Sequence, residues 1–519
     1  MEGSISNQYC FSLLSIDSLC MTRSTSSLYW TWISSSTVNV KLLWMICAIG
    51  RNYDEVESND LCENCIKVFV LCKWKIPSQI WITWFFGVFL YFVFMHRIIL
   101  FLLAFFARAI IRRHHPYVIG VTGTIGKTTL STNIAHLLRT YYGDTAVLLS
   151  PYHYNGEYGL PLTIIGAKTW WKNPLLWIGV FIRACITYIT PYPRYLILEY
   201  GIDHPGEMEF LLSIVKPHIA ILTPVAPNHL EQFGTFSRYH QAKLLLIESA
   251  IDMAIAHESE RQSITRIWVQ YYGKDAQSDA YVIDSVQMID HLSVDIHLWE
   301  DQYHIDIPVF WVYQWENILP LYLLCEFFHI DPDIIRQHQG IFTPEVWRSR
   351  ILKGLAGSVI IDGSYNGGYE SLIRGIESLV PFLGKYRIFC FLWDMRELGD
   401  ETADLHWELA KEIVGCFSGE RNVRFFLVWP SMEHYVVPVL SSKYAVSHSL
   451  SSRVLWDAIR VTLLEDIEPT LIYVKWSQNT IFLEEGIVSF LENSTDVALL
   501  PRQWDGWEEK KETFFRTLS

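Results

Sequence analysis

This sequence has no excess of basic residues over acidic ones. Its 519 residues include 55 acidic and 41 basic side chains, which gives a formal net charge of −14 at pH 7. Proteins that bind nucleic-acid backbones need basic surfaces, so this balance argues against a nucleic acid as the main partner. The chain is long enough for two or three domains.

A complete set of metal-binding cysteines is also missing. Six of the ten cysteines lie before residue 75, and Cys62-x-x-Cys65 has the spacing of half a zinc site without a second half. Stray thiols are the favoured interpretation. Residues 1–78 contain serine-rich patches and short apolar runs with no sustained period, so they receive no predicted function. A misplaced start codon would give the same pattern.

Charged residues are scarce. They make up 18% of the chain, half of the residues are hydrophobic, and the mean hydropathy is +0.18. Ile80–Met95 carries no charge, and Ile98–Ala107 is apolar again after a short interruption. Together these runs are long enough for the ~30 Å core of a bilayer. Their aromatic residues, and the arginines that follow, favour a transmembrane anchor over residues 79–112 rather than a buried helix. The arginines place the remainder of the chain in the cytoplasm.

A phosphate-binding loop is the first strong motif. Tyr117–Val121 is an apolar, strand-like run, and a helical pattern opens at Lys127. Between them, Gly123 and Gly126 let backbone N–H groups converge on phosphate oxygens, and the helix N-terminus adds its positive end. Val121 stands where the general pattern has its first glycine, and a simple glycine-rich turn is the alternative. The nucleotide-binding interpretation assigns ATP contacts to Gly123, Thr124, Gly126, Lys127, Thr128 and Thr129.

The surrounding pattern predicts an α/β fold with a mostly parallel sheet, because apolar strands alternate with amphipathic helices from Val118 onward. One buried strand ends at Glu199, and another is followed by the segment that contains His229. The carboxyl ends of parallel strands meet at one edge of the sheet. Glu199, His229 and Thr128 are therefore expected to lie together and to form a Mg²⁺ site.

These motifs resemble those of the Mur ligases, which make the stem peptides of peptidoglycan. Gly123–Thr129 has the spelling of the family, and Leu198–Glu207 and Asn228–Gly234 resemble the branch that adds D-alanyl-D-alanine to a UDP-muramoyl tripeptide. The resemblance implies that Lys243 is carbamylated and acts as a carboxylate ligand of a second Mg²⁺. An exposed helix lysine is the alternative.

The second half of the chain continues the resemblance. Val359–Asn366 is similar to the family signature Asp-x-Ser-Tyr-Asn, and Leu471–Lys475 is similar to its last strand. The resemblance implies a central ATP-binding domain over residues 115–340 and a C-terminal Rossmann-like domain over 341–519. It assigns further ATP contacts to Asn317, Arg348 and Asp362, and substrate contacts to Tyr365, Asn366, Lys475 and Ser477. Nothing before Tyr117 resembles the family's UDP-sugar domain.

The expected function is that of a bacterial, membrane-anchored, ATP-dependent ligase that forms a peptide bond through an acyl phosphate. The resemblance implies two Mg²⁺ ions and a catalytic set of Lys127, Glu199, His229 and Lys243. The expected substrates are a nucleotide- or lipid-linked peptidoglycan precursor and an amino acid or dipeptide. The alternative is a membrane-tethered ATP-binding protein with a regulatory role and no ligase activity.

Tryptophan is unusually abundant, with 21 residues. At Trp347, Trp393 and Trp476 the neighbouring residues resemble the family, which has glycine at those positions, and Trp429 follows a strand in a similar way. Glycine suits strand ends where φ is positive or a ligand approaches the backbone. UGA codons that the host reads as glycine would explain all of these positions. A diverged paralogue that packs the indoles is the alternative.

Overall fold

A computed structural model describes residues 8–10, 20–24, 27–30 and 78–518, apart from 150–154, 169–173, 228–229, 343–349, 365–368, 396–397, 399–400, 466–467, 476–481 and 504–506. The chain divides into two compact units, Met1–Ile98 and Ile99–Ser519. The first unit contains a three-stranded antiparallel sheet of β1 (Gln8–Cys10), β2 (Cys20–Ser24) and β3 (Ser27–Trp30).

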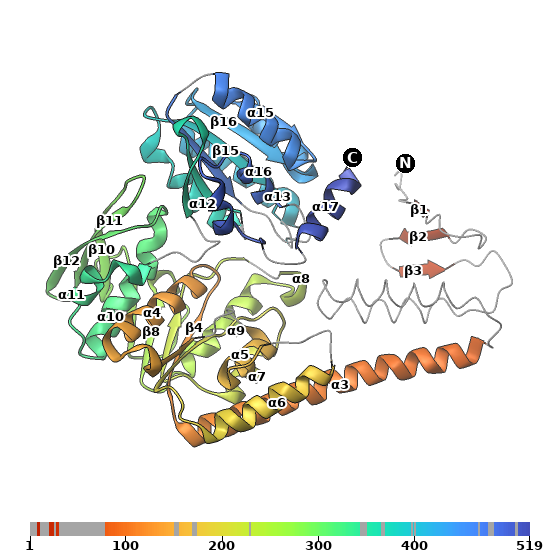
Figure 1. Ribbon diagram of the computed structural model, residues 1–519, viewed down its shortest axis with the longest axis vertical. Helices are drawn as coiled ribbons and strands as arrows, with labels where there is room; N and C mark the ends of the chain where they lie inside the picture. The colour runs from red at the N-terminus through yellow and green to blue at the C-terminus, as the bar shows by residue number, and fades with distance from the viewer. Residues whose placement is uncertain are drawn as a thin grey trace. The chain divides into compact units, whose positions relative to one another are not determined.

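A nine-stranded sheet organises the first half of the second unit (Figure 1). Its order is β12-β11-β10-β9-β8-β7-β4-β6-β5, and neighbouring strands are parallel from β10 to β5, whereas β10, β11 and β12 are antiparallel. The strands are β4 (Tyr117–Thr122), β5 (Val147–Leu149), β6 (Tyr195–Glu199), β7 (Ile219–Leu222), β8 (Met253–His257), β9 (Val269–Gly273), β10 (Ala280–Gln287), β11 (Leu292–Leu298) and β12 (Asp301–Ile307).

Helices cover both faces of this sheet, because its strands are apolar on both sides. Along β4, Ile119 and Val121 enter one hydrophobic core, and Val118 enters another on the opposite face. Such burial on two faces is typical of parallel sheets. One face carries α4 (Lys127–Tyr142), α10 (Leu319–Phe327) and α11 (Asp333–Gln337). The other carries α3 (Ser78–His114), α5 (Gly156–Ile165), α6 (Pro174–Ile189), α7 (Glu207–Ile214), α8 (Leu230–Phe233) and α9 (Phe236–Glu248).

A six-stranded sheet organises the C-terminal part, with the order β13-β14-β18-β15-β16-β17 and only β13 antiparallel to its neighbour. Its strands are β13 (Arg350–Lys353), β14 (Val359–Gly363), β15 (Arg387–Trp393), β16 (Val423–Val428), β17 (Ala445–Ser449) and β18 (Thr470–Lys475). The helices are α12 (Tyr369–Glu377), α13 (Thr402–Phe417), α14 (Val437–Leu440), α15 (Ser452–Glu465), α16 (Glu484–Val488) and α17 (Trp507–Leu518).

Short helical turns connect these elements: η1 (Asp144–Ala146), η2 (Glu258–Glu260), η3 (Val312–Asn317), η4 (Gln339–Phe342), η5 (Leu355–Gly357), η6 (Val380–Phe382), η8 (Met432–Val436) and η9 (Ser494–Leu499). The predicted α/β class with mostly parallel sheets is confirmed. The boundaries between its two domains remain a prediction.

The membrane-anchored location predicted from residues 79–112 is contradicted, and the transmembrane anchor and membrane partner on which it depended are not supported. Within the described part of the chain, no helix has the length and apolarity needed to cross a bilayer. From Ile99 onward, the apolar stripe of α3 packs on protein. Its Leu103, Ala104, Ala107 and Ile110 are buried in the core that also contains α5, α6, α7 and α9.

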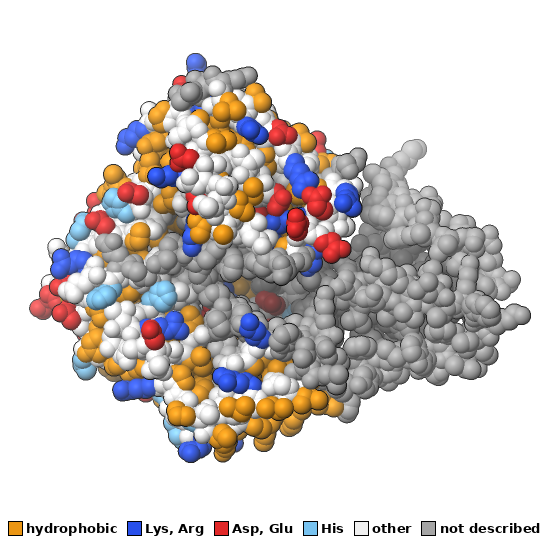
Figure 2. Space-filling model, viewed as in Figure 1, with side chains coloured by type: hydrophobic (Ala, Val, Ile, Leu, Met, Phe, Trp, Pro, Cys, Tyr) orange, Lys and Arg blue, Asp and Glu red, His pale blue; other side chains and the backbone are white. Residues whose placement is uncertain are grey.

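Exposed apolar side chains remain beside that buried stripe. Figure 2 shows hydrophobic side chains along α6, and exposed apolar residues also occur on α3. The residues are Phe101 and Phe105 of α3 and Ile178, Ile182, Ile186 and Ile189 of α6.

Candidate functional site

The turn between β4 and α4 has the geometry of a phosphate-binding loop. Gly126 caps the N-terminus of α4 with φ 85°, and Gly123 has φ 135°. A Cβ atom at Gly123 would clash with the Thr223 hydroxyl, so neither the space nor the backbone angle suits another residue. The loop therefore presents backbone N–H groups at the positive end of a helix.

Two side chains follow this turn at the start of α4. The Lys127 Nζ donates hydrogen bonds to the carbonyl oxygens of Gly123, at 2.9 Å, and Thr124, at 3.3 Å. The Thr128 hydroxyl donates a 3.0 Å hydrogen bond to Glu199 Oε2, at the end of β6. Both Thr128 and Glu199 are buried, so the structure brings together two of the oxygens predicted to bind Mg²⁺.

Thr124 joins the loop to the segment that follows β7. Its N–H donates to the Pro224 oxygen at 3.0 Å, and its hydroxyl accepts from the Ala226 N–H at 3.0 Å. The same hydroxyl is 3.4 Å from the Tyr239 hydroxyl on α9. The phosphate-binding loop is thereby fixed to the two elements that flank the segment of His229.

Lys243 is a buried lysine on α9, with 1% of its surface exposed. Its Nζ lies 4.6 Å from the centre of the Tyr239 ring. Burial and the nearby positive charge of Lys127 hold the pKa of Lys243 well below its ordinary value, although Asp203 and Glu207 oppose the shift. The alternative of an exposed helix lysine is therefore wrong.

Asn317 reaches the phosphate-binding loop from η3. A Cβ atom at Gly126 would clash with Asn317 Oδ1, so the amide lies directly against the loop. The Asn317 Nδ2 donates a 2.7 Å hydrogen bond to Gln314 Oε1, which holds the amide in place. The sequence singled out this residue from a loosely spelled segment, and the structure packs it against Gly126. Its contact with the nucleotide remains a prediction.

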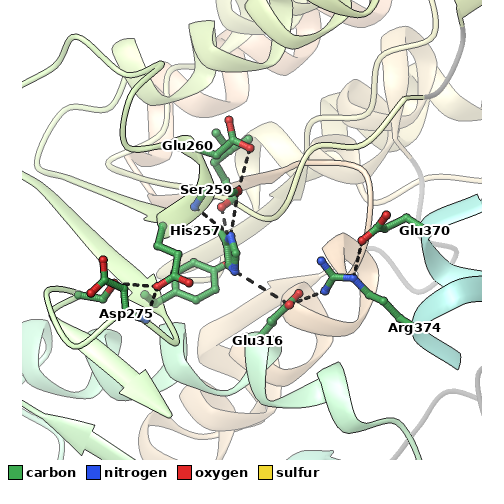
Figure 3. A network of polar contacts seen from close by, with 11 residues as sticks. His257, Ser259, Glu260, Asp275, Glu316, Glu370 and Arg374 are labelled. Atoms are coloured by element: carbon green, nitrogen blue, oxygen red, sulfur yellow. Dashed lines mark hydrogen bonds and ion pairs between the residues drawn. The ribbon is translucent and has the colours of Figure 1, made fainter. Parts of the chain in front are cut away.

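A polar network beside Asn317 was missed by sequence reasoning (Figure 3). Glu316 of η3 pairs with Arg374 of α12, and the Arg374 Nε also donates to Glu370 Oε1 at 2.9 Å. The buried His257, at the end of β8, has its Nε2 4.0 Å from Glu316 Oε1. Burial lowers the pKa of His257 to about 4. The two contacts of Glu316, with Arg374 and with His257, each cross more than fifty residues of sequence, so no local pattern predicts them.

Asp362 and Lys475 lie at the ends of neighbouring parallel strands, β14 and β18, where Gly363 pairs with Lys475. Asp362 accepts a 2.9 Å hydrogen bond from the Ser364 N–H and is almost fully buried. Burial raises its pKa, and Ser364, Arg502 and Lys475 partly oppose this shift. The Lys475 Nζ lies 5.4 Å from the centre of the Trp311 ring.

Five predicted site residues lie outside the described residues: His229, Arg348, Tyr365, Asn366 and Ser477. Within the described ranges, no group of three histidine, cysteine, aspartate or glutamate side chains could hold a metal ion. The predicted Mg²⁺ shell does not need such a group, because it combines Thr128, Glu199 and a modified Lys243 with His229. Hydroxyl and carboxylate oxygens are suitable Mg²⁺ ligands, so Thr128 and Glu199 fit this ion.

Comparison with known proteins identifies relatives of the central region. Residues 182–323 match the family described as the Mur ligase middle domain. The chain is 24% identical over 315 residues to a UDP-N-acetylmuramoyl-tripeptide–D-alanyl-D-alanine ligase from Haemophilus influenzae, covering 58% of this chain and 62% of the relative. A ligase of the same name from Bacillus subtilis is 24% identical over 306 residues, with 58% and 61% covered. The chain thus spans about three fifths of the length of these relatives.

Solved structures share the fold. MurF ligase from Thermotoga maritima, in complex with ADP, has a TM-score of 0.61 at 22% identity, with 77% of this chain and 84% of that chain covered. MurF from Acinetobacter baumannii also has a TM-score of 0.61, at 15% identity, with 75% and 80% covered. At these identities the likeness shows the fold alone.

Proposed function

We propose that this chain, whose residues 182–323 match a Mur ligase middle domain, is an ATP-dependent ligase that joins a carboxylate to an amine through an acyl phosphate. One observation carries the proposal. A phosphate-binding loop, the Thr128–Glu199 pair and the buried Lys243 occupy the same region of one α/β domain. This combination supplies what phosphoryl transfer to a carboxylate needs, which is positioning and charge neutralisation.

The phosphate-binding loop would hold ATP by its backbone. The N–H groups between Gly123 and Thr128 face the phosphates, with Thr129 in the first turn of α4 behind them. Lys127 would exchange its bonds to the carbonyls of its own loop for the β- and γ-phosphates. Asn317 packs against Gly126, and the family resemblance implies that it would lie near the adenine. Arg348 would add a positive charge to the phosphates.

Thr128 and Glu199 would hold one Mg²⁺, and His229 and modified Lys243 would hold a second. Bound Mg²⁺ neutralises phosphate charge and favours transfer of the γ-phosphoryl group. Glu199 is already oriented by the Thr128 hydroxyl, so its carboxylate needs little rearrangement to accept a cation.

Lys243 would be converted to a carbamate. Its lowered pKa favours the neutral amine, whose lone pair attacks CO₂; an N–C bond forms and the nitrogen releases a proton. The product is a buried carboxylate in place of a buried neutral amine. Lys127, whose charge disfavours the Lys243 ammonium, would favour this carboxylate.

The C-terminal sheet would deliver the amine. Asp362, a predicted nucleotide contact, and Lys475 lie at the ends of neighbouring strands, which is where open parallel sheets bind ligands. Tyr365, Asn366 and Ser477 follow those strands in sequence. The γ-phosphoryl group passes to the substrate carboxylate, the amine displaces phosphate, and ADP and phosphate leave with the amide product.

The names of the curated relatives suggest the substrates. Both relatives are UDP-N-acetylmuramoyl-tripeptide–D-alanyl-D-alanine ligases. For this chain we propose a nucleotide-linked peptidoglycan precursor as the acyl substrate and a small amino acid or dipeptide, first among them D-alanyl-D-alanine, as the amine.

Release of ADP and phosphate tests the proposal. The full chain is incubated with ATP, Mg²⁺ and a panel of muramoyl peptides, with and without D-alanyl-D-alanine or single amino acids. Product formation that needs both the acyl substrate and the amine is expected, and Lys127→Ala is the inactive control. ATP binding without amine-dependent phosphate release would instead support the regulatory alternative.

A further inference from the structure

Three tryptophans have a backbone conformation that suits glycine. The φ angle is 67° at Trp268, 56° at Trp299 and 89° at Trp429. Bulky side chains rarely adopt positive φ, because the Cβ atom crowds the backbone. Nine non-glycine residues in the described part of the chain have positive φ, and three of them are tryptophans, although tryptophan makes up only 21 of 519 residues.

Trp299 lies at a hairpin-turn position where glycine is the preferred residue. It is the first of two residues between β11 and β12, where Leu298 pairs with Asp301. Trp299 has positive φ and the following Glu300 does not. This pattern matches a type II′ hairpin turn, in which glycine is the usual first central residue.

Trp429 stands directly after β16, at the end of a parallel strand. Its N–H donates to the Ser449 oxygen at 3.2 Å, and its own oxygen accepts from the Glu433 N–H at 3.2 Å, so the backbone is fixed on both sides. The conformation is therefore set by strand and helix connections. The indole contacts the Trp393 ring, with centroids 5.4 Å apart. The indole N–H of Trp393 is buried without a hydrogen-bond acceptor among the described residues.

No contact of the Trp268 side chain with another described residue stabilises its backbone conformation. Trp268 precedes β9 and is 87% exposed, and no hydrogen bond or ring contact joins its indole to another described residue. Because no contact offsets its backbone strain, the conformation has no explanation in the tryptophan itself.

Trp456 packs its ring without backbone strain, although its indole N–H, like that of Trp393, has no acceptor among the described residues. It lies on α15 without positive φ, and its ring stacks on Phe391 with centroids 4.3 Å apart. A Cβ atom at Gly486 would clash with its indole, so the neighbouring residue leaves space for the ring.

From these backbone conformations we propose that residues 268, 299 and 429 are glycines in the native protein, encoded by UGA triplets that its own translation system reads as glycine. The chain with tryptophan at these positions is then the product of reading the gene by the standard code. Protein expressed under the standard code would carry indoles at a hairpin turn and at an end of the C-terminal sheet.

The gene and the native protein test the proposal directly. The codons at 268, 299 and 429 are expected to be UGA, and peptide mass spectrometry of protein from the source cells is expected to show glycine at all three. UGG codons, or tryptophan in the native peptides, would overturn the proposal.

A stability comparison adds an independent readout on the full chain. The triple variant Trp268→Gly, Trp299→Gly, Trp429→Gly is expected to have a higher Tm than the tryptophan form, because three strained conformations are relieved. The control Trp456→Gly is expected to lower Tm, because it removes a packed ring. A triple variant that melts below the tryptophan form would contradict the inference.

Discussion

The Thr128 hydroxyl donates a hydrogen bond to the Glu199 carboxylate at 3.0 Å, across 71 positions of sequence. Parallel pairing of β4 and β6 causes this contact, because Val121 is the register partner of Glu199 and the turn to α4 begins just beyond it. The sheet thus places a carboxylate beside the phosphate-binding loop.

Replacing Glu199 by glutamine is expected to reduce ADP release by about 10²-fold, because the amide loses the charge that attracts a divalent cation. The Mg²⁺ concentration needed for half-maximal rate should rise as well. Steady-state rates over a Mg²⁺ titration measure both. The exposed Glu209 supplies the control Glu209→Gln, which should change neither quantity. An unchanged Mg²⁺ requirement in Glu199→Gln would remove Glu199 from the metal site.

Lys127→Ala is expected to abolish ATP turnover, with a loss of at least about 10²-fold, because the proposed contact of its ammonium with the γ-phosphate would be lost. The fold should survive, since the ammonium hydrogen-bonds to carbonyls of its own loop. Circular dichroism and ADP release are measured together, with the exposed Lys353→Ala as control. If Lys127→Ala released ADP at the wild-type rate, Lys127 would have no role in binding the phosphates of ATP.

Lys243 is expected to carry CO₂. A carbamate signal should appear in the ¹³C NMR spectrum after addition of ¹³C-bicarbonate and should be absent in Lys243→Arg, whose guanidinium stays charged. Ligase activity should fall in CO₂-depleted buffer and recover with bicarbonate. If neither the ligase activity nor the ¹³C NMR spectrum changes with bicarbonate, Lys243 acts as an unmodified amine.

His257 is expected to make the protein less stable in mild acid. Its pKa is about 4 in the folded protein against 6.5 ordinarily, because burial disfavours the imidazolium. Between pH 6.5 and 4 the unfolded chain therefore binds more protons, and the free energy of unfolding falls as the pH is lowered, by up to about 3 kcal/mol.

Denaturant unfolding of the wild type and of His257→Asn across this pH range isolates the effect. The variant should lose the part of the pH dependence that belongs to His257. Glu484, whose pKa is raised to about 7, acts in the opposite sense in both proteins and cancels in the difference. Parallel curves for the two proteins would contradict the assignment.

Arg374→Ala is expected to lower the free energy of unfolding by about 3 kcal/mol, because it leaves the buried Glu316 without its cation. The double variant Glu316→Gln, Arg374→Met should recover part of that loss. Arg336→Ala, which breaks the exposed pair with Asp333, is the control and should cost less than about 1 kcal/mol. Equal effects of Arg374→Ala and Arg336→Ala would mean that the network does not stabilise the fold.

The sequence predicted what depends on local pattern. Alternating apolar runs indicated the α/β class, and Gly123 and Gly126 marked the loop whose backbone angles require glycine. It could not predict the partner of Arg374, since that contact depends on how α12 packs beside η3. It also indicated a membrane anchor over residues 79–112, which the structure does not support. An apolar segment buried in a protein core, as α3 is around residues 103–110, has the same composition as one in a bilayer.

The outer strand of the nine-stranded sheet protects the protein from association with its own copies. Among the described residues no strand pairs with the outer edge of β12, and such an edge can add a strand from another molecule. Asp301 and Asp306 are exposed along it, and His304 is held 2.7 Å from Asp295 on β11. A second chain would have to bring its backbone against these carboxylates, so β12 discourages fibre-like growth. At the opposite edge, β5 has only three residues and offers little template.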